Sequence, residues 1–159
     1  MQFQSTRDSA LRVSSSEAIV RGLAPKSGLF VPESFPQADL EGWKSLSYPA
    51  LAEQVLKGFL TDYSADFLHG ATAATYGEAF GGKAGETVKV SDGVYALELW
   101  HGPTCAFKDY ALQLMPKLLV EAKKNLGRTE TTRILVATSG DTGKAALAGY
   151  ADLDGIEIE

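Results

Sequence analysis

The sequence is poor in the residues that form disulfides and hold metals. Its 159 residues include one cysteine and two histidines. A single cysteine excludes an internal disulfide framework and fits a reducing compartment, so we expect a cytoplasmic protein. Cys105, His69 and His101 do not have the spacing of a metal-binding motif, and the sequence therefore predicts no metal site.

Long apolar runs and clusters of basic residues are missing as well. No apolar stretch approaches the ~18 residues that a membrane span requires, and the N-terminus shows no secretory signal. The net charge is −5, and the lysines and arginines are scattered between acidic residues. Because no basic stripe is available to meet phosphates, we expect neither nucleic acid nor a membrane as a partner.

Length and composition predict a globular protein of about one domain, roughly 150 residues. Segment 81–85, Gly-Gly-Lys-Ala-Gly, is glycine-rich, but it follows a predicted helix and precedes a predicted strand. A flexible linker is therefore favoured over a phosphate-binding loop. This segment divides the chain into a mostly helical N-terminal segment, residues 1–82, and the beginning of an α/β domain, residues 83–159.

The N-terminal segment carries recognisable helix starts. Ser14 and Glu17 form a predicted capping box before a short helix, and Ser47 and Ser64 precede two longer apolar patterns of helical period, the second reaching Phe80. A further short helix is expected over 40–46. Short strands are expected at 2–6 and 29–32, with a turn at 25–28.

The C-terminal segment predicts a hairpin followed by a βαβ unit. Strands at 87–90 and 94–99 flank an Asp-Gly turn. A long helix is expected from 106 to 126, kinked at Pro116 and ended by Gly127. The apolar run at 132–137 predicts a central parallel strand, buried on both faces, followed by a helix at 143–150 and a strand at 156–158.

A lysine stands at the start of the long predicted helix, where residues 101–109 read His-Gly-Pro-Thr-Cys-Ala-Phe-Lys-Asp. The positive end of a helix dipole disfavours a cation there, so the Lys108 amine is favoured in its neutral form, which is the nucleophile required for a Schiff base. On position alone, an ordinary surface lysine is the simpler interpretation.

A second motif, Ala-Thr-Ser-Gly-Asp-Thr-Gly at residues 137–143, lies between the buried strand and the next helix. The free amides of a helix start, two glycines and two hydroxyls favour an anion-binding turn. An ordinary helix cap by Asp141 or Thr142 is the alternative. A Walker P-loop is excluded, because Thr138 replaces its first glycine and Ala145 replaces its magnesium-binding hydroxyl.

His101 and Cys105 lie four residues apart and raise the possibility of a thiol nucleophile. No third group that would orient the histidine is identifiable, so this alternative is disfavoured. Cys105 is expected to be a small apolar filler beside the site instead.

The two motifs together resemble those of threonine synthases, which are pyridoxal 5'-phosphate (PLP) enzymes with the tryptophan-synthase-β-like fold. Residues 28–32, Gly-Leu-Phe-Val-Pro, resemble the N-terminal segment of that family, so the resemblance extends over nearly the whole chain. Cys105 departs from the larger aliphatic residue expected there. The resemblance implies an α/β protein: an N-terminal helical segment plus the start of a parallel-sheet PLP fold of type II, truncated relative to the family.

The resemblance also implies an activity and a set of site residues. The family converts O-phospho-L-homoserine and water to L-threonine and phosphate. PLP is implied to be covalently bound to Lys108, the catalytic residue, with Phe107 and Asp141 also in the cofactor site. The residues implied to bind substrate are Thr104, Ser139, Gly140, Asp141, Thr142 and Gly143.

Family members are several hundred residues long, so we expect this chain to be an N-terminal piece that is inactive alone. Its last strand could leave an exposed sheet edge for self-association. Two alternatives stay open. One is another PLP enzyme of the same fold, such as a serine or threonine dehydratase, and the other is a non-catalytic anion-binding or assembly module.

Overall fold

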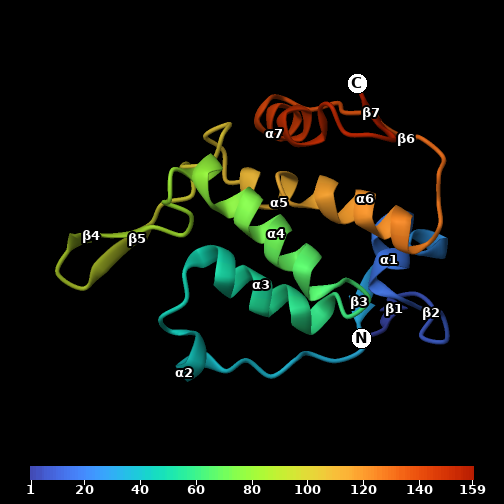
Figure 1. Cartoon of the computed structure of the whole chain (residues 1–159), viewed down its shortest axis with the longest axis horizontal. Coiled ribbons are helices and arrows are strands. Elements are labelled where there is room, and N and C mark those ends of the chain that lie inside the picture. Colours follow the sequence, from blue (N-terminus) through green and yellow to red (C-terminus); the bar gives the residue numbers. More distant parts are fainter.

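The computed structural model describes all residues from 1 to 159 (Figure 1). A three-stranded antiparallel sheet in the order β2-β1-β3 lies at the N-terminal end of the molecule. Its strands are β1 (Phe3–Ser5), β2 (Arg12–Val13) and β3 (Phe30–Pro32), which confirms the strands expected at 2–6 and 29–32. The 3₁₀ turn η1 (Pro25–Ser27) occupies the expected turn before β3.

Helix α1 (Ser15–Arg21) begins where the capping box predicts. The Ser14 hydroxyl accepts a hydrogen bond from the Glu17 amide at 3.2 Å, so one of the unpaired amides of the first turn is satisfied. The helix packs against α6 (Met115–Asn125), far away in the sequence.

The helical layer consists of α2 (Leu40–Trp43), α3 (Tyr48–Phe59) and α4 (Ala65–Tyr76). Ser64 caps α4 by accepting from the Phe67 amide, whereas Ser47 occupies the N-cap of α3 without a side-chain hydrogen bond. The pattern that reaches Phe80 does not form one continuous helix. Helix α4 ends at Tyr76, and the 3₁₀ turn η2 (Glu78–Phe80) follows Gly77.

The hairpin of β4 (Thr87–Ser91) and β5 (Val94–Leu97) confirms the Asp-Gly turn prediction and projects away from the body of the molecule (Figure 1). Its backbone leads directly into the lysine motif. The position of that motif is therefore set by the base of the hairpin on one side and by the following helix on the other.

The single helix expected from 106 to 126 is wrong. The chain forms α5 (Asp109–Leu112) and then α6, with Pro116 in the first turn of α6. Proline has no amide hydrogen and its ring collides with the preceding turn, so it starts a helix more readily than it continues one. Gly127, with φ of 64°, ends α6 as predicted.

The predicted βαβ unit is confirmed: β6 (Thr132–Ile134) and β7 (Ile156–Ile158) pair in parallel across α7 (Asp141–Tyr150). The expectation that 132–137 is a central strand buried on both faces is wrong. The strand ends at Ile134 and Leu135 is 75% exposed. Strand β6 has a single neighbour in its sheet, so its apolar run lacks the layers that would bury it.

Helix α6 belongs to two cores. One face, with Leu118 and Ala122, packs against the helical layer, while Leu119 packs against α7 and β7. Helix α7 also approaches α5 so closely that a Cβ atom on Gly149 would lie 2.0 Å from the Leu112 carbonyl oxygen. No helix has the length and apolar character needed to cross a bilayer.

Candidate functional site

The lysine motif is organised around Asp109, the first residue of α5. Its side chain is 0% exposed and accepts hydrogen bonds from the Thr104 amide (2.8 Å), the Thr104 hydroxyl (2.7 Å) and the Gln113 amide group (3.1 Å). Bonds to a carboxylate are stronger than neutral ones. Gly102 allows the close approach, because a Cβ atom there would lie 2.5 Å from a carboxylate oxygen of Asp109. These hydrogen bonds hold the loop closed around the buried Asp109 carboxylate.

Lys108 lies directly before the first helical residue, at the N-cap of α5 rather than within its first turn. Its side chain is half-buried, and Nζ lies 4.1 Å from the centroid of the Phe107 ring, which is itself 60% exposed. An amine at the rim of an ordered loop, beside an aromatic ring, is accessible to a ligand in a way that a core lysine is not.

Thr104 has a structural function in addition to the one expected of it. The residue is 6% exposed, and its amide and hydroxyl both bond Asp109. Its role in substrate binding stays a prediction. Its carbonyl oxygen faces the other way and accepts a hydrogen bond from Lys144 Nζ at 2.8 Å.

The Lys144–Thr104 bond brings the two motifs together, because Lys144 lies in the first turn of α7. A second contact supports it: the Gln113 side chain that bonds Asp109 also donates to the Ala145 carbonyl oxygen at 3.2 Å. The loop that carries Lys108 and the helix that follows the second motif are therefore joined through α5.

The amide turn at residues 137–143 is open to solvent, whereas the lysine loop is closed around Asp109. The Thr138 hydroxyl accepts from the amides of Gly140 (3.0 Å) and Gly143 (3.1 Å). Gly140 occupies the N-cap of α7, so the alternative of a cap by the Asp141 or Thr142 side chain is wrong. The backbone reaches this cap with a φ of 152° at Gly140, a conformation that residues with a Cβ rarely adopt.

Three amides of this turn are left for a ligand, those of Ser139, Asp141 and Thr142, which find no acceptor within the protein. Ser139, Gly140 and Asp141 are exposed. A cleft of about 430 Å³ is lined by Thr138, Gly140 and Gly143 of the turn, by Lys144 and Leu147 of α7, and by Val136 and Glu159. Amides that point outward from a helix start bind carboxylates and phosphates well.

The expectation that Cys105 is a buried filler is wrong. Cys105 is exposed and has a φ of 57°, because the loop reverses there through a hydrogen bond from its amide to the Gly102 carbonyl oxygen. His101 directs Nε2 to Glu98 at 2.5 Å. Glu98 is therefore the orienting group that could not be identified in the sequence, but no hydrogen bond joins the imidazole to Cys105, so the thiol alternative stays disfavoured.

Sequence reasoning missed the structural roles of Thr138 and Lys144, and it assigned no role in the site to Asp109. The spacing of Thr104 and Asp109 and the hydroxyl two residues before Gly140 were the available signals. The lysine and the amide turn together supply a nucleophilic nitrogen and an anion-binding backbone, the two elements required to act on an anionic amino acid through a carbonyl cofactor.

Comparison with known proteins identifies the family. Residues 2–76 match the threonine synthase N terminus. The chain is 37% identical to the threonine synthase of Pseudomonas aeruginosa, over 99% of this chain and 34% of that protein. This chain belongs to the threonine synthase family.

Solved threonine synthase structures share the fold. The PLP-bound threonine synthase of Brucella melitensis superposes with a TM-score of 0.91 at 33% identity, over 99% of this chain and 34% of that one. The threonine synthase of yeast superposes with a TM-score of 0.88 at 32% identity, covering 99% and 34%. The chain thus spans about a third of the length of the threonine synthases that it matches.

Proposed function

We propose that the protein to which this chain belongs converts O-phospho-L-homoserine and water to L-threonine and phosphate, with PLP bound covalently to Lys108. The observation that carries the proposal is the 2.8 Å hydrogen bond from Lys144 to the Thr104 carbonyl oxygen, which joins the lysine loop to the amide turn. Family membership supplies the reaction, and this junction supplies a reason for both motifs to act together.

The residues of the chain fit one side of a PLP site. Lys108 offers a half-buried amine, Phe107 offers an exposed ring face, and Asp141 stands at the open start of α7. When bound, PLP supplies an electron sink for negative charge that develops on the substrate. The chain would be one part of a fold-type-II enzyme and inactive alone.

The substrate is held at the turn. Ser139, Asp141 and Thr142 offer unpaired amides, and Gly140 and Gly143 let the carboxylate of the amino acid approach the backbone. Thr104 is assigned to the substrate side of the loop. Lys108 carries protons at Nζ between substrate atoms, which requires that the buried Asp109 hold the loop in one conformation.

The first experiment tests Lys108 on the chain itself. PLP is added, the adduct is reduced with borohydride, and the modified peptides are mapped by mass spectrometry. We expect preferential labelling of Lys108, and Lys108→Ala removes that peptide's label. Lys124→Ala serves as the control, because it removes an exposed amine that lies outside both motifs. Equal labelling of all accessible lysines would contradict the assignment.

The second experiment tests the activity. A chimera in which this chain replaces the matching first third of the Pseudomonas aeruginosa enzyme is assayed for phosphate and threonine. We expect turnover that Lys108→Ala abolishes, and none from the 159-residue chain alone. Formation of 2-oxobutanoate in place of threonine would indicate a dehydratase. Retained turnover in the Lys108→Ala chimera would refute the catalytic role.

Two less direct aspects belong to the same proposal. We place the protein in the cytoplasm, as its single cysteine suggests. We also propose that the sheet of β6 and β7 associates with a second copy, because each strand has an unpaired edge. Sedimentation of the chain over a range of concentrations measures this association directly.

A further inference from the structure

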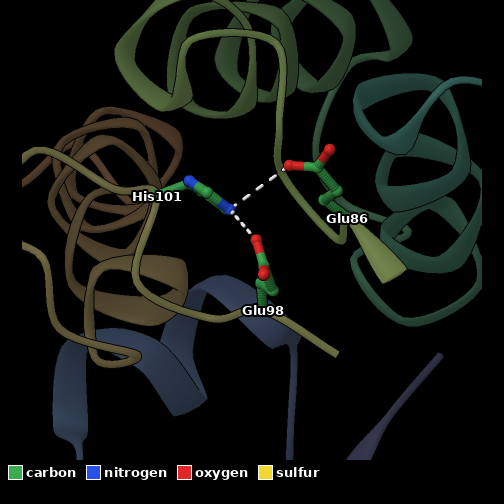
Figure 2. A group of neighbouring side chains, drawn as sticks. All are labelled: Glu86, Glu98 and His101. Atoms are coloured by element: carbon green, nitrogen blue, oxygen red, sulfur yellow. Dashed lines mark hydrogen bonds and ion pairs between the residues drawn. The ribbon is translucent and has the colours of Figure 1, made fainter. Parts of the chain in front are cut away.

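We propose that Glu86, Glu98 and His101 form a binding site for a divalent transition-metal ion such as Zn²⁺. Figure 2 shows that both carboxylates point toward the imidazole ring. One ligand atom from each residue lies within 4.8 Å of those of the other two. His101 is the first residue of the lysine motif, but none of the three residues is assigned to the PLP or substrate site, so this proposal is independent of the proposed function.

The base of the hairpin holds the two carboxylates side by side. Glu86 directly precedes β4 and Glu98 directly follows β5, and the Glu98 amide donates to the Glu86 carbonyl oxygen at 2.9 Å. His101 follows three residues later, where the chain enters the lysine loop. The two carboxylates therefore come from backbone that is fixed by strand pairing, and His101 lies close to them in the chain that follows.

The hydrogen bonding of this cluster is incomplete. His101 Nε2 can carry one hydrogen, but it faces Glu98 at 2.5 Å and Glu86 at 3.3 Å. The facing oxygen of Glu86 is buried and has no hydrogen-bond partner. Lys83 Nζ lies 3.3 Å from the same oxygen, also without a hydrogen bond. The Glu86 oxygen therefore has an ion pair with Lys83 but no hydrogen bond, and a buried acceptor without a hydrogen bond can take an additional partner.

A metal ion bound by all three residues would supply that partner. It would take the place of the Nε2 hydrogen and accept a lone pair from each carboxylate. An imidazole nitrogen with two carboxylates suits Zn²⁺ and related transition ions, whereas Mg²⁺ and Ca²⁺ prefer oxygen ligands alone. Three protein ligands leave the fourth tetrahedral position of Zn²⁺ for water.

The consequence for the fold is a fixed connection. An ion at this position would fasten the base of the projecting hairpin to the first residue of the lysine loop. Its function would be to stabilise that junction, because its ligands belong to the base of the hairpin and to the start of the loop.

The test is titration of the 159-residue chain with Zn²⁺ by calorimetry, with Co²⁺ absorption as a second readout of the ligand set. We expect one saturable site, and each of Glu86→Gln, Glu98→Gln and His101→Asn should weaken binding more than about tenfold. Circular dichroism verifies that each variant is folded. Mg²⁺ at the same concentrations should not compete.

The matched control is His69→Asn. His69 Nδ1 also pairs with a glutamate, Glu53, at 2.8 Å, but no second carboxylate faces it. Zn²⁺ binding should be unchanged in this variant. Absence of saturable binding to the unmodified chain, equal loss in His69→Asn and His101→Asn, or unchanged binding in Glu86→Gln would each show that the cluster is an ion-pair network only. None of these readouts depends on PLP or turnover.

Discussion

The lysine loop and the amide turn are built from similar residues and have opposite structures. Each contains at least one glycine, at least one threonine and an aspartate near the start of a helix. In the loop, Asp109 is buried and accepts three hydrogen bonds. In the turn, Asp141 is exposed and three amides find no partner in the protein. The loop is complete without a ligand, and the turn is not.

The difference separates positioning from binding. A closed loop fixes the point from which the Lys108 side chain extends, since its backbone is anchored on both sides of Thr104. An open turn keeps its donors available for an anion. The same residue types thus give rigidity in one motif and leave exposed donors in the other, where we propose that they bind the substrate, and burial makes the difference.

The largest test of this comparison exchanges the two aspartates for asparagine. Asp109→Asn removes the charge and turns an NH₂ group toward donors, so we expect a loss of about 3 kcal/mol in the free energy of unfolding, measured in urea. Asp141→Asn should change it by less than about 0.5 kcal/mol. Equal effects would mean that the loop does not depend on a buried charge.

Glycine substitutions give the next largest contrast. Gly102→Ala would place a Cβ atom 2.6 Å from the Asp109 Cβ atom, and we expect about 2 kcal/mol of destabilisation in thermal unfolding. At Gly143 the nearest atom is the Thr138 hydroxyl oxygen at 3.1 Å, a less severe approach that a displacement of a few tenths of an ångström relieves. Gly143→Ala should therefore be close to neutral. A stability loss in Gly143→Ala as large as in Gly102→Ala would contradict the open turn.

Thr138→Val tests the one internal support of the amide turn. It removes the acceptor for Gly140 and Gly143, and we expect a loss of about 1 kcal/mol. Hydrogen exchange should accelerate at those two amides, while the Thr104 amide, which is bonded to Asp109, stays protected. Thr138→Ser, which retains the acceptor, is the control, and accelerated exchange in that variant would argue against the hydroxyl's role.

Lys144→Met should have a smaller effect on stability, about 0.5–1 kcal/mol, because it removes one hydrogen bond and retains the aliphatic stem. The informative readout is coupling. If the bond joins the motifs, the losses in Lys144→Met and Thr138→Val should not be additive in the double variant. Strict additivity would leave the two motifs energetically independent.

The smallest effect concerns Asp62, a second carboxylate whose hydrogen-bond donors come from within the protein. It accepts hydrogen bonds from the Ser15 hydroxyl and the Ser16 amide. Partial burial raises its pKa, but these hydrogen bonds outweigh burial and hold the pKa below its ordinary value of 3.8. Its stabilisation is therefore present above pH 3.8 and is lost as the pH falls through the lower folded pKa. Asp62→Asn should weaken the pH dependence of the unfolding free energy in that range. An unchanged pH dependence would contradict this assignment.

Much of the fold could be predicted from local signals. Ser14, Ser64 and the Asp-Gly turn each act through neighbours two or three residues away, so the helix starts and the hairpin were predictable. The role of Pro116 was predicted wrongly. A proline can kink one helix or start another, and these two outcomes differ only in the path of the preceding chain. The burial of β6 depends on layers that its own residues do not specify.

The candidate site likewise combines features that local sequence predicts with contacts that it does not. Motif composition predicted the lysine and the amide turn, since both act through adjacent backbone. The bond between Lys144 and Thr104, and the meeting of Glu86, Glu98 and His101, join residues brought together by strand and helix packing. The division of the chain into segments 1–82 and 83–159 also stays a prediction, because it concerns how the pieces behave when separated.

Helix α6 bears on that division. Leu118 and Ala122 complete the aromatic interior formed by the first half of the sequence, while Leu119 completes the interior beneath α7. If the chain were divided in the glycine-rich segment 81–85, the N-terminal segment would lose the α6 side chains that pack against its hydrophobic core. The two pieces should therefore be obtained in folded form by co-expression rather than one at a time.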